Sequence, residues 1–212
     1  MTPFVLTYLI LNILVLLLSI QPLLWQLLHH NLASTSHIAF IILLLLLNTL
    51  NVLLWPQPLT LASNPGLILC DIELPLLLLA KYGFYGSTAA MLRNLARILD
   101  ADEIELVQSR KAKVMAQVVD GVLCFGIPTL VVGGHYAVQS ARYMLYPVVG
   151  CVASVSWNWV SVVVMDAPLW VFNVIMAYYA GSLLRFPAPI EHKASRCPSN
   201  RNLANVSCLI AI

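Results

Sequence analysis

The stretch IAFIILLLLLNTLNVLLW, residues 38–55, decides the fold class, because it is almost entirely aliphatic and carries no charged side chain. An apolar run of this length is long enough for an α-helix to cross the hydrocarbon core of a bilayer. It ends at Trp55-Pro56, and tryptophan is enriched where a helix leaves the membrane. We therefore interpret residues 38–55 as a membrane-spanning helix.

The composition of the whole chain agrees with this interpretation. Of the 212 residues, 60% are hydrophobic and only 9% are charged, and the mean hydropathy is +0.87. Soluble domains carry roughly 25% charged residues, so this chain has too few charges to cover a water-soluble surface. The net charge of +2 is too small to indicate nucleic acid as a partner. We expect the lipid bilayer to be its solvent.

Four further apolar stretches predict additional spans. The predicted spans are residues 4–28, 38–55, 67–92, 114–132 and 159–184. The fold class that follows is an all-α integral membrane protein with about five transmembrane helices within residues 1–186. Residues 133–158 are mixed in composition and are expected to form an ordered loop edged by aromatic residues. Residues 187–212 contain no apolar run long enough to cross, so we expect a disordered tail.

The basic residues predict the orientation of the spans, because short loops rich in Lys and Arg stay on the cytoplasmic side. The connection between residues 92 and 114 holds five of them, whereas residues 56–66 hold none. The five are Arg93, Arg97, Arg110, Lys111 and Lys113. We therefore expect the N-terminus outside the cell and the tail in the cytosol.

Two cysteines are placed where they could bond. Cys70 stands at the outer mouth of the third span and Cys151 near the end of the second outer loop, so both face the oxidising side. We predict a disulfide between them, with two free thiols as the alternative. The sequence shows no CxxC pair and no His/Cys cluster with metal-ligand spacing, so we expect neither a metal nor another cofactor.

Three ionisable residues fall inside predicted spans. Lys81 lies near the expected bilayer centre, and Asp120 and Asp166 are its candidate counter-charges. Such residues are costly in lipid and usually face a cavity or a partner. We therefore treat these three residues as candidate ligand-binding or intramembrane polar sites. The alternative is that Lys81 only extends to the interface or neutralises a charge within the bundle.

The basic cluster suggests a cytosolic docking surface. Arg93 and Arg97 lie four residues apart and therefore on one helical face. With Arg110, Lys111 and Lys113 they could receive a cytosolic partner, or they could simply anchor the helices at the membrane surface. The chain contains no Ser/His/Asp or HExxH arrangement, so we do not expect an enzyme.

The order of several motifs carries a family resemblance. Cys70-Asp71-Ile72-Glu73 opens the third span, and Arg93-Asn-Leu-Ala-Arg97-Ile-Leu closes it. Gly126-Ile127-Pro128, His135-Tyr136 and Val149-Gly150-Cys151 then follow in unbroken order. In this order the motifs resemble the fungal mating-pheromone receptors of the a-factor receptor type, a G-protein-coupled class. The resemblance covers residues 7–186.

The resemblance implies a function and its partners. Such receptors have seven spans in the plasma membrane, bind a short lipid-modified peptide pheromone from outside and activate a heterotrimeric G protein within. A receptor oligomer is a further expected partner. This chain departs from the family at Pro75, where a basic residue is usual, and its resemblance stops after Phe186. We therefore expect a receptor shortened after the fifth span and unable to signal, because span six is the element that moves to admit the G protein.

Two other functions stay open at this point. The chain could be a small transporter or channel that uses Lys81, Asp120 and Asp166 as a polar pathway. Such a protein is expected to contain an internal repeat or paired broken helices, and neither is evident in the sequence. Alternatively, the chain could be a non-signalling partner of full-length receptors.

The orientation is testable by protease access. With one epitope tag after Thr2 and another after Ile212, we expect protease added to sealed cells to remove only the first, because the positive loops hold the tail inside. Permeabilised cells, in which both tags should be cleaved, are the control. Cleavage or protection of both tags together in sealed cells would contradict five spans with the N-terminus outside.

Overall fold

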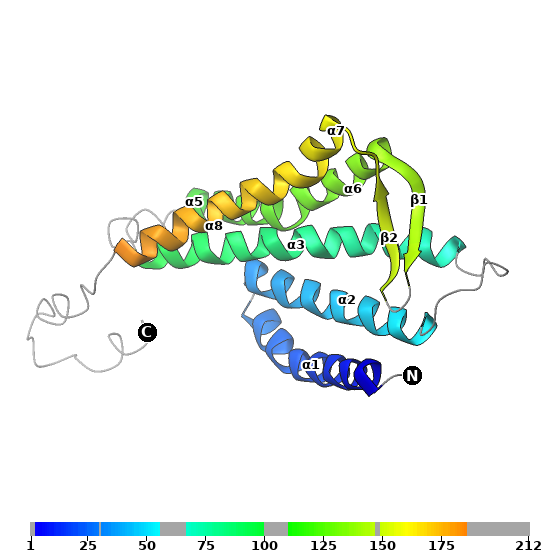
Figure 1. Cartoon of the computed structure of the whole chain (residues 1–212). Coiled ribbons are helices and arrows are strands. Elements are labelled where there is room, and N and C mark those ends of the chain that lie inside the picture. Colours follow the sequence, from blue (N-terminus) through cyan, green and yellow to red (C-terminus); the bar gives the residue numbers. More distant parts are fainter. Residues whose placement is uncertain (1–2, 30, 56–66, 100–109, 147–148, 186–212) are drawn as a thin grey trace, which may run out of the picture.

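The computed structural model describes residues 3–29, 31–55, 67–99, 110–146 and 149–185, and its long helices pack side by side (Figure 1). The elements are α1 (Pro3–Leu28), α2 (Leu32–Leu54), α3 (Leu67–Leu99), α5 (Arg110–Gly121), the π-helical segment η1 (Val122–Gly126), α6 (Ile127–Val138), β1 (Gln139–Tyr146), β2 (Gly150–Val155), α7 (Trp159–Ser161), the π-helical segment η2 (Val162–Asp166) and α8 (Ala167–Arg185). α5, η1 and α6 form one continuous rod, and α7, η2 and α8 form another. The predicted tail, residues 187–212, lies outside the described residues.

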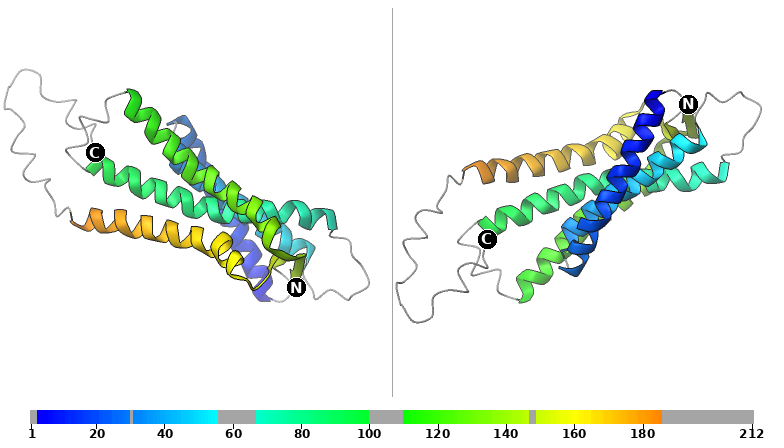
Figure 2. Two further views of the ribbon diagram at one scale, coloured as in Figure 1. Left: turned by 90° about the horizontal axis from the view of Figure 1, so that it is seen from above. Right: turned by 90° about the horizontal axis from the view of Figure 1, so that it is seen from below.

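Four of the described helical rods are long and apolar enough to cross a membrane. They are Pro3–Leu28, Leu32–Leu54, Lys113–Val138 and Trp159–Leu184, and they match four of the predicted spans. The predicted span at residues 67–92 is the first part of α3, which has 33 residues but a more polar composition. α3 lies in the middle of the bundle, with α2, α6 and α8 around it (Figure 2). Ser87 and Arg93 of α3 are therefore buried between helices, whereas Lys81 is exposed. The chain is an all-α membrane protein, with one hairpin among the described residues.

That hairpin was not predicted. Where the sequence suggested a loop at residues 133–158, α6 continues to Val138 and two antiparallel strands follow. The register pairs Gln139 with Val155 and Tyr146 with Gly150. The valines and tyrosines of this stretch favour strands, but we interpreted them only as an aromatic edge at the interface. The hairpin lies across the end of the bundle that contains the first turns of α3 (Figure 1).

The core of the bundle forms where α3 meets η1, α6 and α8. Fully buried side chains here include Ala89, Ala90, Cys124 and Phe172. Small residues on α3 allow this close contact. The clearest case is Gly86, where an added Cβ would collide with the backbone carbonyl oxygen of Leu123 and would meet Phe172 at 3.3 Å.

Both π-helical segments lie just before a proline. η1 ends two residues before Pro128, and η2 ends two residues before Pro168. A proline has no N–H to continue the helical hydrogen-bond pattern. The Ile127 N–H instead bonds to the carbonyl of Val122, and the Ala167 N–H bonds to that of Val162. Gly126-Ile127-Pro128 therefore lies at a bulge within a continuous rod.

Gly86 and Gly121 give a matched test of this packing. We expect Gly86→Ala to lower the free energy of unfolding by about 1–3 kcal/mol, because α3 must move away from the η1 backbone. Gly121→Ala should leave it unchanged or raise it by up to about 1 kcal/mol, since nothing lies within 4 Å of the added Cβ. Denaturant unfolding in detergent micelles measures both. Equal effects of the two substitutions would contradict the close contact.

Candidate functional site

The hairpin is fixed to the start of α3 by a disulfide. Cys70 of α3 and Cys151 of β2 are bonded, with their Cα atoms 5.5 Å apart across a sequence separation of 81 residues. Arg142 of β1 also faces Asp71 of α3, with its Nη1 atom 3.7 Å from Oδ2, but both side chains are largely exposed. Such exposed ion pairs contribute little to stability, so the disulfide is the main connection between the hairpin and α3. The structure thus brings together the two cysteines singled out in the sequence.

The start of β2 packs onto α2. Gly150 begins β2 with a φ of +83°, and a Cβ at this position would collide with the side chain of Asn51. Asn51, Trp55 and Glu73 are all at least nine-tenths buried, and each carries a polar atom without a hydrogen-bond partner among the described residues. Unpaired buried polar groups are costly, and native proteins tolerate them mainly at functional or strained positions. From the sequence, Trp55 was expected only to mark the end of a span, and no role was expected for Asn51.

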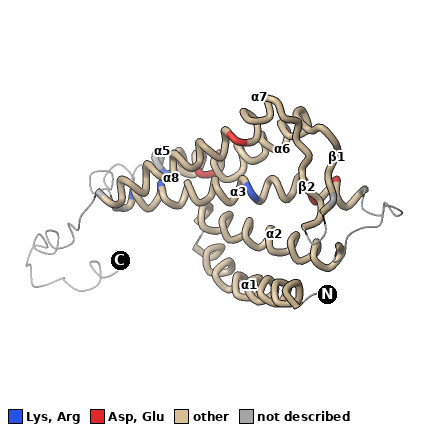
Figure 3. The backbone as a smooth tube through the Cα atoms, in the orientation of Figure 1, with Lys and Arg blue, Asp and Glu red and all other residues tan. Residues whose placement is uncertain are grey.

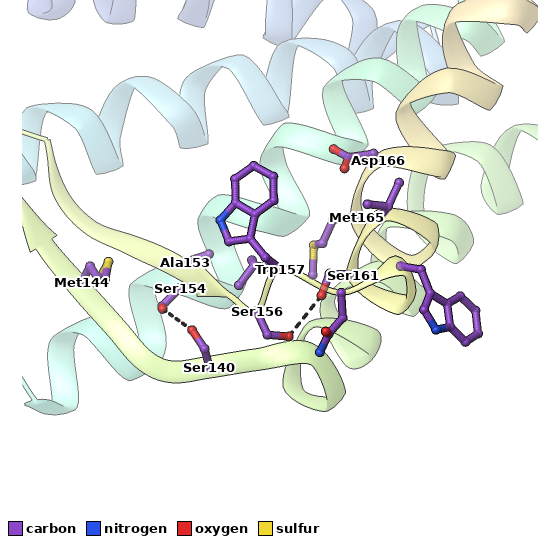
Figure 4. Close-up of a pocket in the computed structure, with 13 residues that line it drawn as sticks. Ser140, Met144, Ala153, Ser154, Ser156, Trp157, Ser161, Met165 and Asp166 are labelled. Atoms are coloured by element: carbon purple, nitrogen blue, oxygen red, sulfur yellow. Dashed lines mark hydrogen bonds between the residues drawn. The ribbon is translucent and has the colours of Figure 1, made fainter.

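A cavity of about 830 Å³ lies between the hairpin and η2 (Figure 4). Its walls come from both strands, from the β2–α7 connection and from the first turns of the last helical rod. Two serine pairs line it: Ser140 and Ser154 have hydroxyl oxygens 2.7 Å apart, and those of Ser156 and Ser161 are 3.2 Å apart. These hydroxyl groups hold the strands to each other and the connection to α7.

The remaining wall combines apolar side chains with one carboxylate. Trp157 is fully exposed at this cavity, and the side chains of Met144 and Met165 also line it. Asp166, the last residue of η2, is exposed and is the cavity's charged group. Figure 4 shows Trp157 and Asp166 on the same side of the cavity, above the paired serines. The site can therefore offer hydrogen bonds, apolar contact and a negative charge at once.

Lys81 does not pair with either predicted counter-charge. Its side chain is exposed on α3, and within the described part of the chain no ion pair joins it to Asp120 or Asp166. The neighbouring residue instead makes the contact to η2, because the Tyr82 hydroxyl donates to the carbonyl oxygen of Met165 at 2.7 Å. α3 therefore reaches η2 one residue before Asp166, through a neutral hydrogen bond. The few charges of the bundle are shown in Figure 3.

Asp120 belongs to a buried ion pair at the opposite end of the bundle. Arg93 Nη2 donates to Asp120 Oδ1 at 2.8 Å and to the carbonyl oxygen of Ala116 at 3.0 Å. Asn94 Nδ2 donates to the second carboxylate oxygen at 2.9 Å. Arg93 and Asp120 are 9% and 6% exposed. The prediction that Asp120 balances Lys81 is therefore wrong, because its carboxylate is saturated by α3.

The same pair changes the predicted docking surface. Arg93 points into the α3–α5 contact and does not present its charge at the surface. Arg97 is half-buried and takes part in an interaction of its own. Lys111 and Lys113 are exposed on the first turns of α5, which begins at Arg110. Of the five candidates, the two lysines are thus the residues whose described side chains face outward.

A histidine links α2 to α3 between the two ends. The Nδ1 atom of His37 lies 3.2 Å from the Ser87 hydroxyl and 3.4 Å from the Thr88 hydroxyl, and its ring stacks on Phe84. This contact was also missed, because nothing in the sequence brings residues 50 positions apart together.

No group of three His, Cys, Asp or Glu side chains suited to a metal occurs in the part of the chain that the structure describes.

Comparison with known proteins gives one family. A family model described as Pheromone A receptor matches residues 7–207. The "Pheromone B alpha 1 receptor" of Schizophyllum commune is 26% identical over 170 residues, which are 80% of this chain and 26% of that protein. The "Pheromone a factor receptor" of Saccharomyces cerevisiae is 27% identical over 178 residues, which are 81% of this chain and 36% of that protein. No solved structure matches.

Two facts follow from these matches. The chain spans about a quarter to a third of the length of these curated relatives. The family match also continues to residue 207, beyond Phe186, where the sequence resemblance was expected to stop. That expectation is therefore wrong for residues 187–207.

The buried ion pair is testable by substitution. We expect Asp120→Leu to lower the free energy of unfolding by about 3–5 kcal/mol, because it leaves the Arg93 guanidinium buried without a counter-charge. The double variant Arg93→Met, Asp120→Leu should recover most of that loss, since no charge stays buried. Asp71→Leu, which removes the exposed pair with Arg142, is the matched control and should cost less than about 1 kcal/mol. Additive effects of the two substitutions would show that the pair does not act as a unit.

Proposed function

Since this chain belongs to the Pheromone A receptor family, we propose that it forms the ligand-binding and partner-binding part of a receptor for a peptide pheromone. In this proposal the peptide binds in the cavity between the hairpin and η2, at the outer end of the bundle. A heterotrimeric G protein contacts the opposite end. The chain is embedded in a membrane, which we take to be the plasma membrane.

The observation that supports the ligand site best is the disulfide-anchored hairpin. It provides one wall of the cavity, and the Cys70–Cys151 bond holds that wall against the bundle. A volume of about 830 Å³ lies within the range of ligand pockets, roughly 300–1,000 Å³, and such pockets are mainly apolar with a few placed polar groups. The lining of Trp157, the two methionines and the paired serines has this character. An amphipathic peptide with a lipid group matches it.

The inner end supports a G-protein contact more weakly. Lys111 and Lys113 give α5 an exposed basic start, and the Arg93–Asp120 pair holds that helix against α3. A shift of α3 would therefore be passed to α5 through this pair and through the Gly86 contact with η1. We propose that the two lysines, and not Arg93, face the cytosolic partner.

The transporter alternative loses its main support. It required Lys81, Asp120 and Asp166 to share one polar pathway, but the Asp120 carboxylate is occupied by Arg93 and Asn94. Lys81 and Asp166 are exposed on α3 and η2 without an ion pair between them among the described contacts. The three residues thus serve different parts of the bundle.

Photoaffinity labelling tests the proposed ligand site. With the full 1–212 chain in lipid nanodiscs and a panel of synthetic lipid-modified peptides carrying a benzophenone group, we expect labelling of residues 153–166 that excess unlabelled peptide suppresses. Gly150→Val should reduce this labelling severalfold, because the side chain would push the hairpin off Asn51. Gly133→Val is the matched control, since its added Cβ has nothing within 4 Å. Suppressible labelling confined to α1 would contradict the proposed site.

A further inference from the structure

The position of Asp166 within its helix is unusual for a carboxylate. It lies seven residues after Trp159, which begins a rod apolar enough to cross a membrane, so its Cα atom is about 10 Å along the helix from that start. An ionised group at this depth is costly when it faces lipid, and such residues normally face a cavity, water or an opposite charge. In this structure Asp166 faces the outer cavity.

Among the residues that the structure describes, no Lys or Arg forms an ion pair with Asp166. Arg142 is paired with Asp71, and Arg93 is paired with Asp120. The nearest contact of α3 is the Tyr82 hydroxyl, which donates to the carbonyl oxygen of Met165 and not to the Asp166 carboxylate. The cavity therefore holds one negative charge without a described counter-charge.

The other residues of the cavity indicate which type of chemical group the Asp166 carboxylate would bind. The serine hydroxyls that line the cavity are paired with one another, so they are satisfied before any ligand binds. Trp157 exposes its whole indole ring and lines the same cavity as Asp166 (Figure 4), and an indole face attracts cations as well as apolar groups. A cavity lined by a carboxylate and an exposed indole suits an ammonium or guanidinium group with an aliphatic stem.

We infer that Asp166 binds a positively charged group of the ligand, so that the outer cavity selects cationic, amphipathic peptides over neutral or acidic ones. This inference rests on the proposed function, because it concerns the same cavity and the same class of ligand. It adds that the ligand carries a positive charge and that Asp166 is the residue that binds this charge. Trp157 supports the aliphatic part next to that charge.

Charge-swapped peptides test the selection directly. The probes are three synthetic lipid-modified peptides that differ at one position, which is Lys, norleucine or Glu, and binding is measured on the full chain in nanodiscs. We expect the Lys peptide to bind about tenfold more tightly than the norleucine peptide, as for one charge-assisted contact. Asp166→Asn should remove this preference, and Asp166→Lys should reverse it in favour of the Glu peptide.

Asp71→Asn is the matched control, because Asp71 is the other exposed aspartate near the hairpin but does not line the cavity. It should keep the preference for the Lys peptide. If Asp71→Asn and Asp166→Asn change the preference equally, or if Asp166→Asn leaves it intact, the inference is overturned. Failure of the proposed function gives a different result, namely no saturable binding of any of the three peptides.

A ligand-independent measurement tests whether the carboxylate is available. Val162 is exposed and lines the same cavity, so Val162→Cys, with Cys197 and Cys208 changed to Ser, reports the local potential through thiol modification. A cationic methanethiosulfonate should react severalfold faster than an anionic one, and Asp166→Asn should remove this difference. The same pair of reagents on Tyr136→Cys, on α6 away from the cavity lining, should show no dependence on Asp166. Equal rates at Val162→Cys would mean that another part of the receptor already neutralises Asp166, and the inference would fail.

Discussion

Close packing of α3 against its neighbours is the constraint on which the described bundle depends. In a bilayer, lipid tails are as apolar as the helices, so association relies on van der Waals contact and interhelical hydrogen bonds more than on removal of apolar surface from water. Gly86 permits backbone contact with Leu123 in η1, and Ala89 and Ala90 are fully buried. The Tyr82 hydroxyl adds a hydrogen bond to Met165 in η2. One helix thereby holds both bulged rods in place.

The central position of α3 also explains why it can be the most polar of the long helices. Its neighbours cover one part of its surface, so Ser87 can meet His37 and Arg93 can meet Asp120 away from lipid. The two ends of α3 are attached to their neighbours by different types of bond. Near its start α3 is bonded covalently to β2 through Cys70, whereas near its end it is held to α5 by a buried ion pair. Any displacement of α3 would therefore reach both the hairpin and α5.

The two proline-associated bulges link the packing of α3 to the proposed ligand site. π-helical segments are often found at functional sites, and here each one faces α3: η1 at Gly86 and η2 at Tyr82. η2 also ends in Asp166 and borders the outer cavity. A ligand bound in this cavity would act on η2, whose Met165 carbonyl oxygen accepts the hydrogen bond from Tyr82 of α3. In the proposed function, this contact gives a physical route from the cavity to α3 and, through Arg93 and Asp120, to α5.

The sequence by itself determined that the chain is a membrane protein of packed helices, because uninterrupted apolar runs of bilayer length allow little else. It also determined the family, through the order of the motifs around Cys70, Arg93 and Gly126-Ile127-Pro128, and it singled out both disulfide cysteines. The sequence did not determine which residues pair with each other across the bundle. Asp120 binds Arg93 and not Lys81, and Gly150 of the hairpin fits against Asn51, about 100 residues away in the chain. Periodicity and composition describe what one helix presents to its surroundings, but the rotation and close approach of α3 decide which side chains meet.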